Sequence, residues 1–252
     1  MSHSLEVNKF AILKVMEKSL KDLLRDVKEA ICIQGMPGIA NVGKVVVDFL
    51  IEYNNAKGIL QVYFSDFPSH VSVDDAGRVK ALKSEVYFYW DERAERNVFL
   101  LTGDAQPTSS IGVNVLSKNI ANLLHELNVE LVISLGAMPT DKLSGKYRVF
   151  VTATSADLLE EYGGLPGVEV LREGVVIGMN GLVPCFASNL HGIKGLILLS
   201  ETLSVLERDA RASYALARIL WEKFKLNVNI EEFKNKNGLA NSYNGDQPGY
   251  LS

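Results

Sequence analysis

A glycine-rich turn between an apolar run and an amphipathic run places the strongest constraint on how this chain folds. Residues 30–34 read AICIQ, residues 35–43 read GMPGIANVG, and apolar side chains recur at helical spacing across residues 42–53. A short buried strand, a tight turn and a helix, in that order, are typical of the first unit of a parallel α/β sheet. The segment therefore predicts an α/β fold.

Apolar patterns elsewhere predict a single domain over residues 1–233. Residues 10–27 carry apolar side chains at helical spacing, and residues 70–74 and 78–82 flank a hairpin turn at residues 75–77. We expect a mixed, mostly parallel sheet flanked by helices, from which the hairpin is an antiparallel excursion. Further strands are expected at residues 58–64, 84–90, 98–104, 131–139, 146–155, 175–181 and 195–202, and further helices at residues 110–127 and 156–163.

The C-terminal third contains two predicted helix starts and a change of composition. Pro184 suits the first position of a helix that Gly192 ends, and Ser204 opens a capping-box pattern ahead of the last helix. After Phe233 the sequence turns to Asn, Gly and other polar residues, and apolar periodicity stops. We therefore expect residues 234–252 to form a flexible C-terminal tail.

Charge and hydropathy exclude several classes of partner. The formal net charge is -4 and the sequence pI is about 5.7, with no polybasic run that could neutralise a phosphate backbone. The apolar runs are shorter than the ~20 residues that a membrane helix needs, and no signal peptide is apparent. Cys32 and Cys185 both lie in apolar runs, which indicates buried thiols in a reducing compartment. We expect a cytoplasmic protein that binds neither nucleic acid nor membrane.

The glycine-rich turn also has the spacing of a phosphate-binding loop. Gly38 to Lys44 fits G-x-x-x-x-G-K, in which backbone N–H groups converge on phosphate oxygens. The next residue should be Ser or Thr, whose hydroxyl ligates Mg²⁺, but it is Val45. Two interpretations follow: the glycines allow a tight strand-to-helix turn, or an anion or nucleotide contacts the helix N-terminus.

Candidate catalytic residues are few. Asp104 follows an apolar strand, where it could organise Mg²⁺, but an Asp before a helix more often caps it or forms a turn. The sequence has no CxxC, HxxxH or GxSxG pattern, and none of the four histidines (His3, His70, His125 and His191) lies in a loop at a predicted strand end. We therefore predict no catalytic centre, no metal site and no cofactor, hence a binding protein and not an enzyme.

Three segments together resemble the proteasome assembly chaperone family, in its chaperone-2-like branch found in archaea and eukaryotes. They are IQGMPGIANVGKVVVDFLIE, LLTGDAQP and ISLGAMPT, and the resemblance extends from about residue 30 to about residue 224. It implies a phosphorylase-like α/β fold with no established catalytic centre, and oligomers that help proteasome α subunits to assemble. The motif residues in this chain are Gly35, Pro37, Gly38, Asn41, Val42 and Gly43 of the first segment and Gly103, Asp104, Gln106 and Pro107 of the second.

The resemblance also implies a role for the last three residues. Many family members end in a hydrophobic residue, a tyrosine and any last residue, which insert between adjacent proteasome α subunits. This chain ends in Tyr250, Leu251 and Ser252, so the tyrosine stands one place early and the match is partial. Several tails on one oligomer would multiply a modest affinity.

We therefore expect a proteasome assembly chaperone homologue or adaptor that forms a homo-oligomer; the alternative is a phosphorylase-like or degenerate nucleotide-binding enzyme using the glycine-rich loop.

Overall fold

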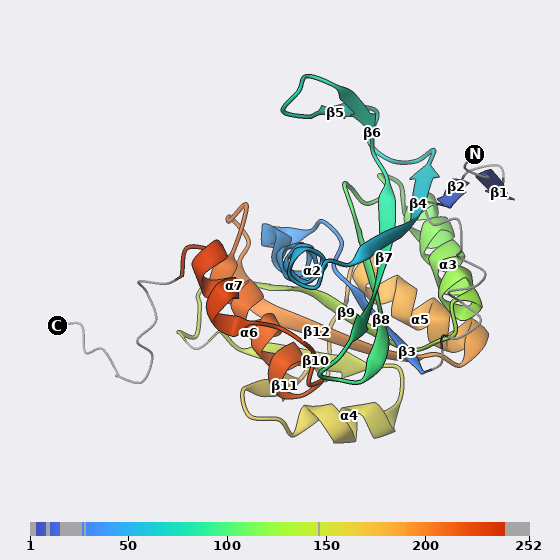
Figure 1. Ribbon diagram of the computed structural model, residues 1–252. Coiled ribbons are helices and arrows are strands. Elements are labelled where there is room, and N and C mark those ends of the chain that lie inside the picture. Colours follow the sequence, from blue (N-terminus) through green and yellow to red (C-terminus); the bar gives the residue numbers. More distant parts are fainter. Residues whose placement is uncertain (1–3, 9–10, 16–26, 28, 146, 240–252) are drawn as a thin grey trace.

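The fold is built on one large mixed β-sheet. The computed structural model describes residues 4–8, 11–15, 27, 29–145 and 147–239. The sheet has ten strands in the order β1-β2-β4-β7-β8-β3-β9-β12-β10-β11 (Figure 1). The predicted single α/β domain with a mixed sheet flanked by helices is confirmed. The strands are β1 Ser4–Asn8, β2 Ala11–Val15, β3 Ala30–Gln34, β4 Lys57–Phe64, β7 Ser84–Asp91, β8 Arg96–Gly103, β9 Val129–Thr140, β10 Val149–Ala153, β11 Val168–Val170 and β12 Lys194–Leu203.

Parallel pairing is concentrated in the centre of the sheet. Strands β8, β3, β9 and β12 run parallel to one another, and β10 also pairs parallel with β11. The other five pairings are antiparallel, so "mostly parallel" holds only for the central strands. The loop of residues 92–95 between β7 and β8 is too short for the crossover that a parallel pair requires.

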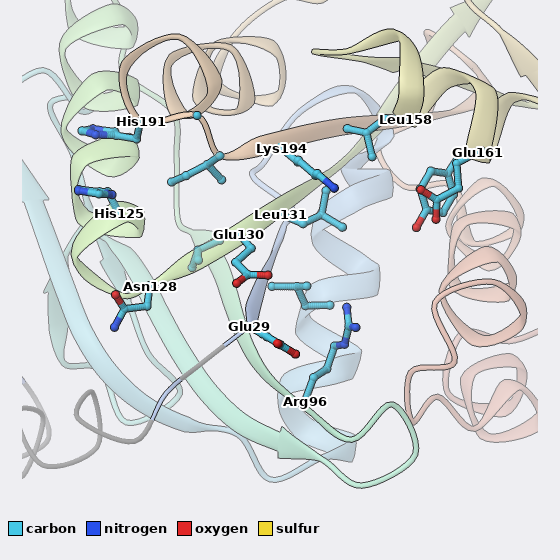
Figure 2. A pocket seen from close by; sticks show the side chains of 15 residues that line it. Glu29, Arg96, His125, Asn128, Glu130, Leu131, Leu158, Glu161, His191 and Lys194 are labelled. Atoms are coloured by element: carbon cyan, nitrogen blue, oxygen red, sulfur yellow. The ribbon is translucent and has the colours of Figure 1, made fainter.

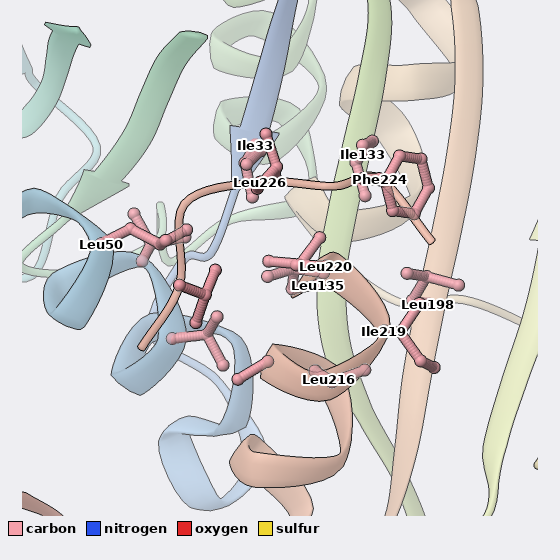
Figure 3. Packing of buried hydrophobic residues seen from close by; sticks show 14 of the residues in the cluster. Ile33, Leu50, Ile133, Leu135, Leu198, Leu216, Ile219, Leu220, Phe224 and Leu226 are labelled. Atoms are coloured by element: carbon pink, nitrogen blue, oxygen red, sulfur yellow. The ribbon is translucent and has the colours of Figure 1, made fainter. Parts of the chain in front are cut away.

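Helices cover both faces of the sheet because side chains along each strand alternate between two cores. In β3, Ile31 and Ile33 face the core shared with α2 and α6, whereas Ala30 and Cys32 face the core shared with α3 and α5. Figure 3 shows the first core, where burial contributes about 1.5–3 kcal/mol for each large aliphatic side chain. The helices are α2 Val42–Tyr53, α3 Ser110–Glu126, α4 Ala156–Gly163, α5 Met179–His191, α6 Ala210–Glu222 and α7 Ile230–Lys236, with a 3₁₀ turn, η1, at Ile39–Asn41.

The predicted N-terminal helix was wrong where the structure describes it. Residues 11–15 form strand β2, which pairs antiparallel with β4 from Ala11↔Phe64 to Val15↔Leu60. Residues 16–26 and 28 lie outside the described part of the chain. A mainly apolar run of five residues is compatible with the periodicity of a helix and with that of a strand. The open edge of β4 favours a strand, because it offers unpaired backbone N–H and C=O groups.

The strand predicted at residues 175–181 was also wrong. Helix α5 begins at Met179, which places Pro184 inside the helix and not at its first position. Val175 and Ile177 are each 84% exposed, so burial stabilises no strand there. The predicted helix end was right, because Gly192 is the C-cap in the left-handed conformation.

The last long helix begins later than the capping-box pattern predicted. Asp209, and not Ser204, is the N-cap of α6, since its carboxylate accepts hydrogen bonds from the backbone N–H groups of Arg211 and Ala212 at 3.0 Å each. The side chain of Asp209 also accepts a 2.7 Å hydrogen bond from the Thr202 hydroxyl. Asp209 is buried and accepts hydrogen bonds from three donors, so it is a stronger N-cap than the exposed Ser204.

Helix α7 crosses the position where the composition changes. It spans Ile230–Lys236, and Phe233 is fully buried with its ring centroid 5.0 Å from that of Phe49. Leu239, just beyond the helix, is also buried. The ordered structure therefore continues past residue 233, while Tyr250, Leu251 and Ser252 lie outside the described residues.

Two smaller predictions have different outcomes. The hairpin is confirmed, with β5 Val71–Val73 paired antiparallel to β6 Val79–Ala81. Cys32 is buried, which raises the pKa of its thiol well above the ordinary value, but Cys185 is exposed on α5, contrary to the prediction. Among the described residues, no helix is long and apolar enough to cross a membrane.

Candidate functional site

Loops that follow the parallel strands gather at the carboxyl edge of the sheet, where α/β proteins place ligands. Gln106 ties three of them together. Its side-chain Nε2 donates a 2.6 Å hydrogen bond to the carbonyl oxygen of Pro37, and its Oε1 accepts a 2.9 Å hydrogen bond from the backbone N–H of Met179. The two motif loops and the start of α5 are thus joined by one amide, which donates to the first loop and accepts from the helix.

Two motif glycines allow close backbone contact between the loop, α2 and the sheet. A Cβ on Gly43 would lie 2.0 Å from the carbonyl oxygen of Leu135 in β9, and a Cβ on Gly35 would lie 2.3 Å from the carbonyl oxygen of Gly43. Neither glycine has a positive φ. Glycine is therefore needed at both positions for proximity, because backbone oxygens occupy the space that a side chain would need.

The rest of the glycine-rich loop is held against the start of α6. Ala40 and Asn41 are both left-handed, with φ of 50° and 49°. The Asn41 side chain donates a 3.3 Å hydrogen bond to the carbonyl oxygen of Glu207, and the carbonyl oxygen of Ala40 accepts one of 3.1 Å from the backbone N–H of Asp209. Val42 is buried, and its carbonyl oxygen accepts a 3.0 Å hydrogen bond from the Ser213 hydroxyl.

Lys44 and Asp104, the residues that phosphate chemistry would use, make internal contacts. The Lys44 ammonium lies 3.0 Å from Asp48 Oδ1 and 3.4 Å from the Thr102 hydroxyl. Asp104 Oδ2 accepts a 3.0 Å hydrogen bond from the backbone N–H of Lys83, whose carbonyl oxygen accepts one of 2.9 Å from the Asp104 N–H. The geometry favours the tight-turn interpretation for the first motif and a turn role for Asp104.

A cavity of about 660 Å³ lies beside these loops. Its cations are Lys44, Arg208 and Lys236, and its anions are Asp48, Glu52 and Asp104. Lys44 pairs with Asp48 at 3.0 Å and Lys236 with Glu52 at 2.9 Å, so two of the three cations are compensated, whereas Arg208 donates to the neutral Asn237 side chain and keeps its charge. In the part of the chain that the structure describes, no cluster of three or more His, Cys, Asp or Glu side chains could hold a metal ion.

Glu201, at the end of β12, has a role that sequence analysis missed. Its side chain is only 1% exposed and accepts hydrogen bonds from the N–H and hydroxyl of Ser144 and from the backbone N–H of Arg148. Desolvation raises the pKa of Glu201, but these hydrogen bonds and the Arg148 guanidinium at 3.5 Å outweigh it and lower the pKa overall. Glu201 fastens the loop of residues 141–148 and is not poised for proton transfer.

A second cavity, of about 570 Å³, opens at the opposite edge of the sheet (Figure 2). His125 and His191 line it, and both lie in the last turn of their helices. The two rings also stack, with centroids 4.4 Å apart, and His191 Nε2 lies 2.8 Å from Asn122 Oδ1. Sequence spacing could not show this stacking because α3 and α5 meet only in the folded protein.

Comparison with known proteins decides the family. A sequence model of the PAC2 family matches residues 32–237, which is most of the chain. The chain belongs to the PAC2 family. The resemblance to proteasome assembly chaperones is confirmed, since the PAC2 match is accompanied by solved structures of such homologues.

Three relatives cover the PAC2 domain. The crystal structure of Pyrococcus furiosus PbaB, titled an archaeal proteasome activator, has a TM-score of 0.79 at 25% identity and covers 92% of this chain and 96% of its own. Pyrococcus furiosus PbaA, titled an archaeal homolog of proteasome-assembly chaperone, has a TM-score of 0.74 at 27% identity, covering 92% and 88%. The uncharacterized protein MJ1210 of Methanocaldococcus jannaschii is 27% identical over 225 residues, covering 89% of this chain and 85% of its own.

The PAC2 match includes both motif loops and helix α7 and ends at residue 237. Within the matched region, Gln106, Gly35 and Gly43 build the scaffold of the carboxyl edge. The last three residues lie beyond the match. Any role of Tyr250, Leu251 and Ser252 therefore depends on properties of the tail itself.

Proposed function

We propose that this PAC2 protein is a proteasome assembly chaperone homologue or adaptor, which binds proteasome α subunits through the surface of a homo-oligomer and through its C-terminal tail. The observation that carries the proposal is the family match together with the structural likeness to PbaB and PbaA across 92% of the chain. The carboxyl edge supports it, because the motif residues contact one another and build a scaffold there. The proposed setting is the cytoplasm.

The position of the tail supports a docking role. Phe233 and Leu239 are buried, so the tail starts from a fixed point on the domain. The thirteen residues after Leu239 could extend by at most about 45 Å. Tyr250 and Leu251 supply apolar anchors after a polar segment. Such a segment binds with modest affinity that oligomerisation multiplies.

Deleting residues 250–252 should weaken capture of the proteasome core particle. We expect at least about a tenfold loss in apparent affinity, because a buried aromatic anchor contributes about 1.4 kcal/mol or more. The measurement is a pull-down or surface binding assay with assembled α subunits, and deletion of residues 241–243 is the matched control of equal length. Equal capture by the full chain and by the 250–252 deletion would remove the tail's role, and no capture by the full chain would remove the proposed function.

A nucleotide-binding enzyme is the competing function, and the cavity beside Lys44 is where it would be found. We expect inorganic phosphate, nucleosides and nucleotides to leave the melting temperature unchanged, since Lys44 is paired with Asp48. The measurement is a thermal-shift screen of the full chain and of Lys44→Ala. A stabilising shift that Lys44→Ala abolishes would favour the enzyme instead.

A further inference from the structure

The cavity of about 570 Å³, at the edge where strands β3, β9 and β12 begin, combines an apolar floor with charged walls (Figure 2). Its apolar lining is buried or half-buried and consists of Ile31, Val129, Leu131, Leu158 and Ile193. Its charged lining comes from five separate segments of the chain and consists of Glu29, Arg96, Glu130, Glu161 and Lys194. A concave site with an apolar surface and a few converging charges has the form of a small-molecule site.

The charges of this lining do not neutralise one another in pairs. In the part of the chain that the structure describes, none of the five charged side chains forms an ion pair. In the cavity at the carboxyl edge, by contrast, two of the three cations are paired with carboxylates at 3.0 and 2.9 Å. The charges at the amino edge therefore remain available to a charged ligand.

Arg96 carries a hydrogen-bond donor that the rest of the described chain does not use. The residue is half-buried, and its Nε is buried without an acceptor among the described residues. A buried donor without an acceptor raises the free energy of the folded protein, so a bound carboxylate would satisfy it with a charge-assisted hydrogen bond. Lys194, which reaches the cavity from the other side in Figure 2, adds a second cation.

Arg96 and Glu161 act on the same neighbour, the hydroxyl of Tyr162. Burial, followed by a hydrogen bond to Glu161 and its negative charge, raises the pKa of Tyr162 to about 12, whereas the positive charge of Arg96 opposes this rise. The Tyr162 ring stacks on that of Phe224 with centroids 4.9 Å apart, which holds the hydroxyl in place. Opposite charges thus lie near one another without being paired, as a ligand that carries both signs requires.

The charges of the lining specify the charges of the ligand. With the two histidines counted as neutral, the lining carries two positive and three negative charges. A ligand with one carboxylate and two cationic groups balances them. A dicarboxylate would face three glutamates, and a diamine would leave the Nε of Arg96 without an acceptor. The apolar floor favours methylene groups between the charged groups of the ligand.

We propose that this cavity binds a free basic α-amino acid, such as L-lysine or L-arginine. The carboxylate of the ligand binds Arg96 and Lys194, its two cationic groups face the glutamates, and its methylene groups lie on the apolar floor. The cavity lies at the edge of the sheet opposite to the motif loops. The inference is therefore a further binding activity and does not rest on the proposed function.

The test is isothermal titration calorimetry of the full chain with three related ligands. L-lysine carries all three charged groups, L-norleucine lacks the side-chain ammonium, and cadaverine lacks the carboxylate. We expect L-lysine to bind at least about tenfold more tightly than either analogue, because each analogue loses charge-assisted hydrogen bonds. Equal binding of the three ligands, or no heat of binding with L-lysine and L-arginine at about 10 mM, would overturn the inference.

Two variants assign the binding to this cavity. Arg96→Gln should weaken the binding of L-lysine at least about tenfold and should not weaken that of cadaverine, which has no carboxylate for Arg96 to bind. Lys194→Gln, at an exposed position, should act in the same direction and does not disturb a half-buried side chain. The melting temperature of each variant shows whether it is folded.

The glutamates are tested with a matched pair on helix α4. Glu161→Gln should weaken the binding of L-lysine and of cadaverine, whereas Glu160→Gln should not, because Glu160 is exposed on the same helix and lies outside the lining. If Arg96→Gln and Lys194→Gln both bound L-lysine as the unaltered chain does, the ligand would lie elsewhere and the inference would be overturned. Capture of the proteasome core particle is measured separately, so this inference and the proposed function can fail independently.

Discussion

Replacing Gly43 by valine should remove folded protein. A Cβ at this position would lie 2.0 Å from the carbonyl oxygen of Leu135, and the two further methyl groups of valine would extend the overlap. The obstacle is backbone in a central strand, so it cannot rotate away as a flexible side chain could. We expect destabilisation of more than about 4 kcal/mol, a large part of the roughly 5–15 kcal/mol that holds a domain folded.

Gly38 provides the matched control within the same motif. A Cβ there would meet nothing closer than 3.9 Å, and its φ of -171° is extended backbone that any residue adopts. Gly38→Ala should therefore change the free energy of unfolding by less than about 1 kcal/mol. Urea unfolding measures both variants, with the yield of unaggregated protein as a second readout. A Gly43→Val chain with native stability would show that α2 does not pack on β9 as described.

This contrast shows what the motif spacing could and could not predict. Glycine at residues 35 and 43 correctly indicated a strand-to-helix turn, because few other residues permit so close an approach of backbones. The same spacing also fitted a phosphate-binding loop. Only the packed structure separates the two, since the carbonyl oxygen that fills the space beside Gly43 comes from Leu135, far along the chain.

Local periodicity was reliable where a segment was long and strongly patterned. The helix predicted at residues 110–127 is α3, Ser110–Glu126, and the helix predicted at residues 156–163 is α4, Ala156–Gly163. Residues 11–15 show the opposite case, in which pairing with a distant edge overrides helical spacing. The order of the strands in the sheet likewise depends on pairing between distant segments, because the sequence contains no signal that tells which sheet edge a strand joins.

Contacts across the chain account for what sequence reasoning missed at the carboxyl edge. Gln106 was singled out as a motif residue, but its partners Pro37 and Met179 lie 69 and 73 residues away. Asp209 caps α6 through its own neighbours and also holds Ala40, a contact that local capping patterns do not contain. In both cases the residue type was visible in the sequence, whereas the partner became visible only in the fold.

Glu201→Ala should cause the second large loss of stability. The substitution leaves the N–H and hydroxyl of Ser144 and the N–H of Arg148 without the carboxylate that accepts their hydrogen bonds. A donor left unsatisfied costs about 1–3 kcal/mol when it is buried, and here the cost is reduced because Ser144 is exposed and Arg148 is half-buried, so we expect a total of about 2–4 kcal/mol. Chemical unfolding at neutral pH measures the change, and Glu207→Ala, at an exposed position on the same edge, is the control.

The same carboxylate makes the stability depend on pH in a defined direction. The pKa of Glu201 is lower in the folded protein than in the unfolded chain, so protons bind the unfolded state more readily. Its stabilising contribution is therefore complete above the unfolded pKa of about 4.3 and is lost as the pH falls towards the lowered folded pKa. Glu201→Gln, which cannot ionise, should flatten this part of the profile as the pH falls below the unfolded pKa of about 4.3, where Glu207→Gln should not. If the unaltered chain and Glu201→Gln lost stability in parallel over that range, the loop of residues 141–148 would not be fastened by an ionised Glu201.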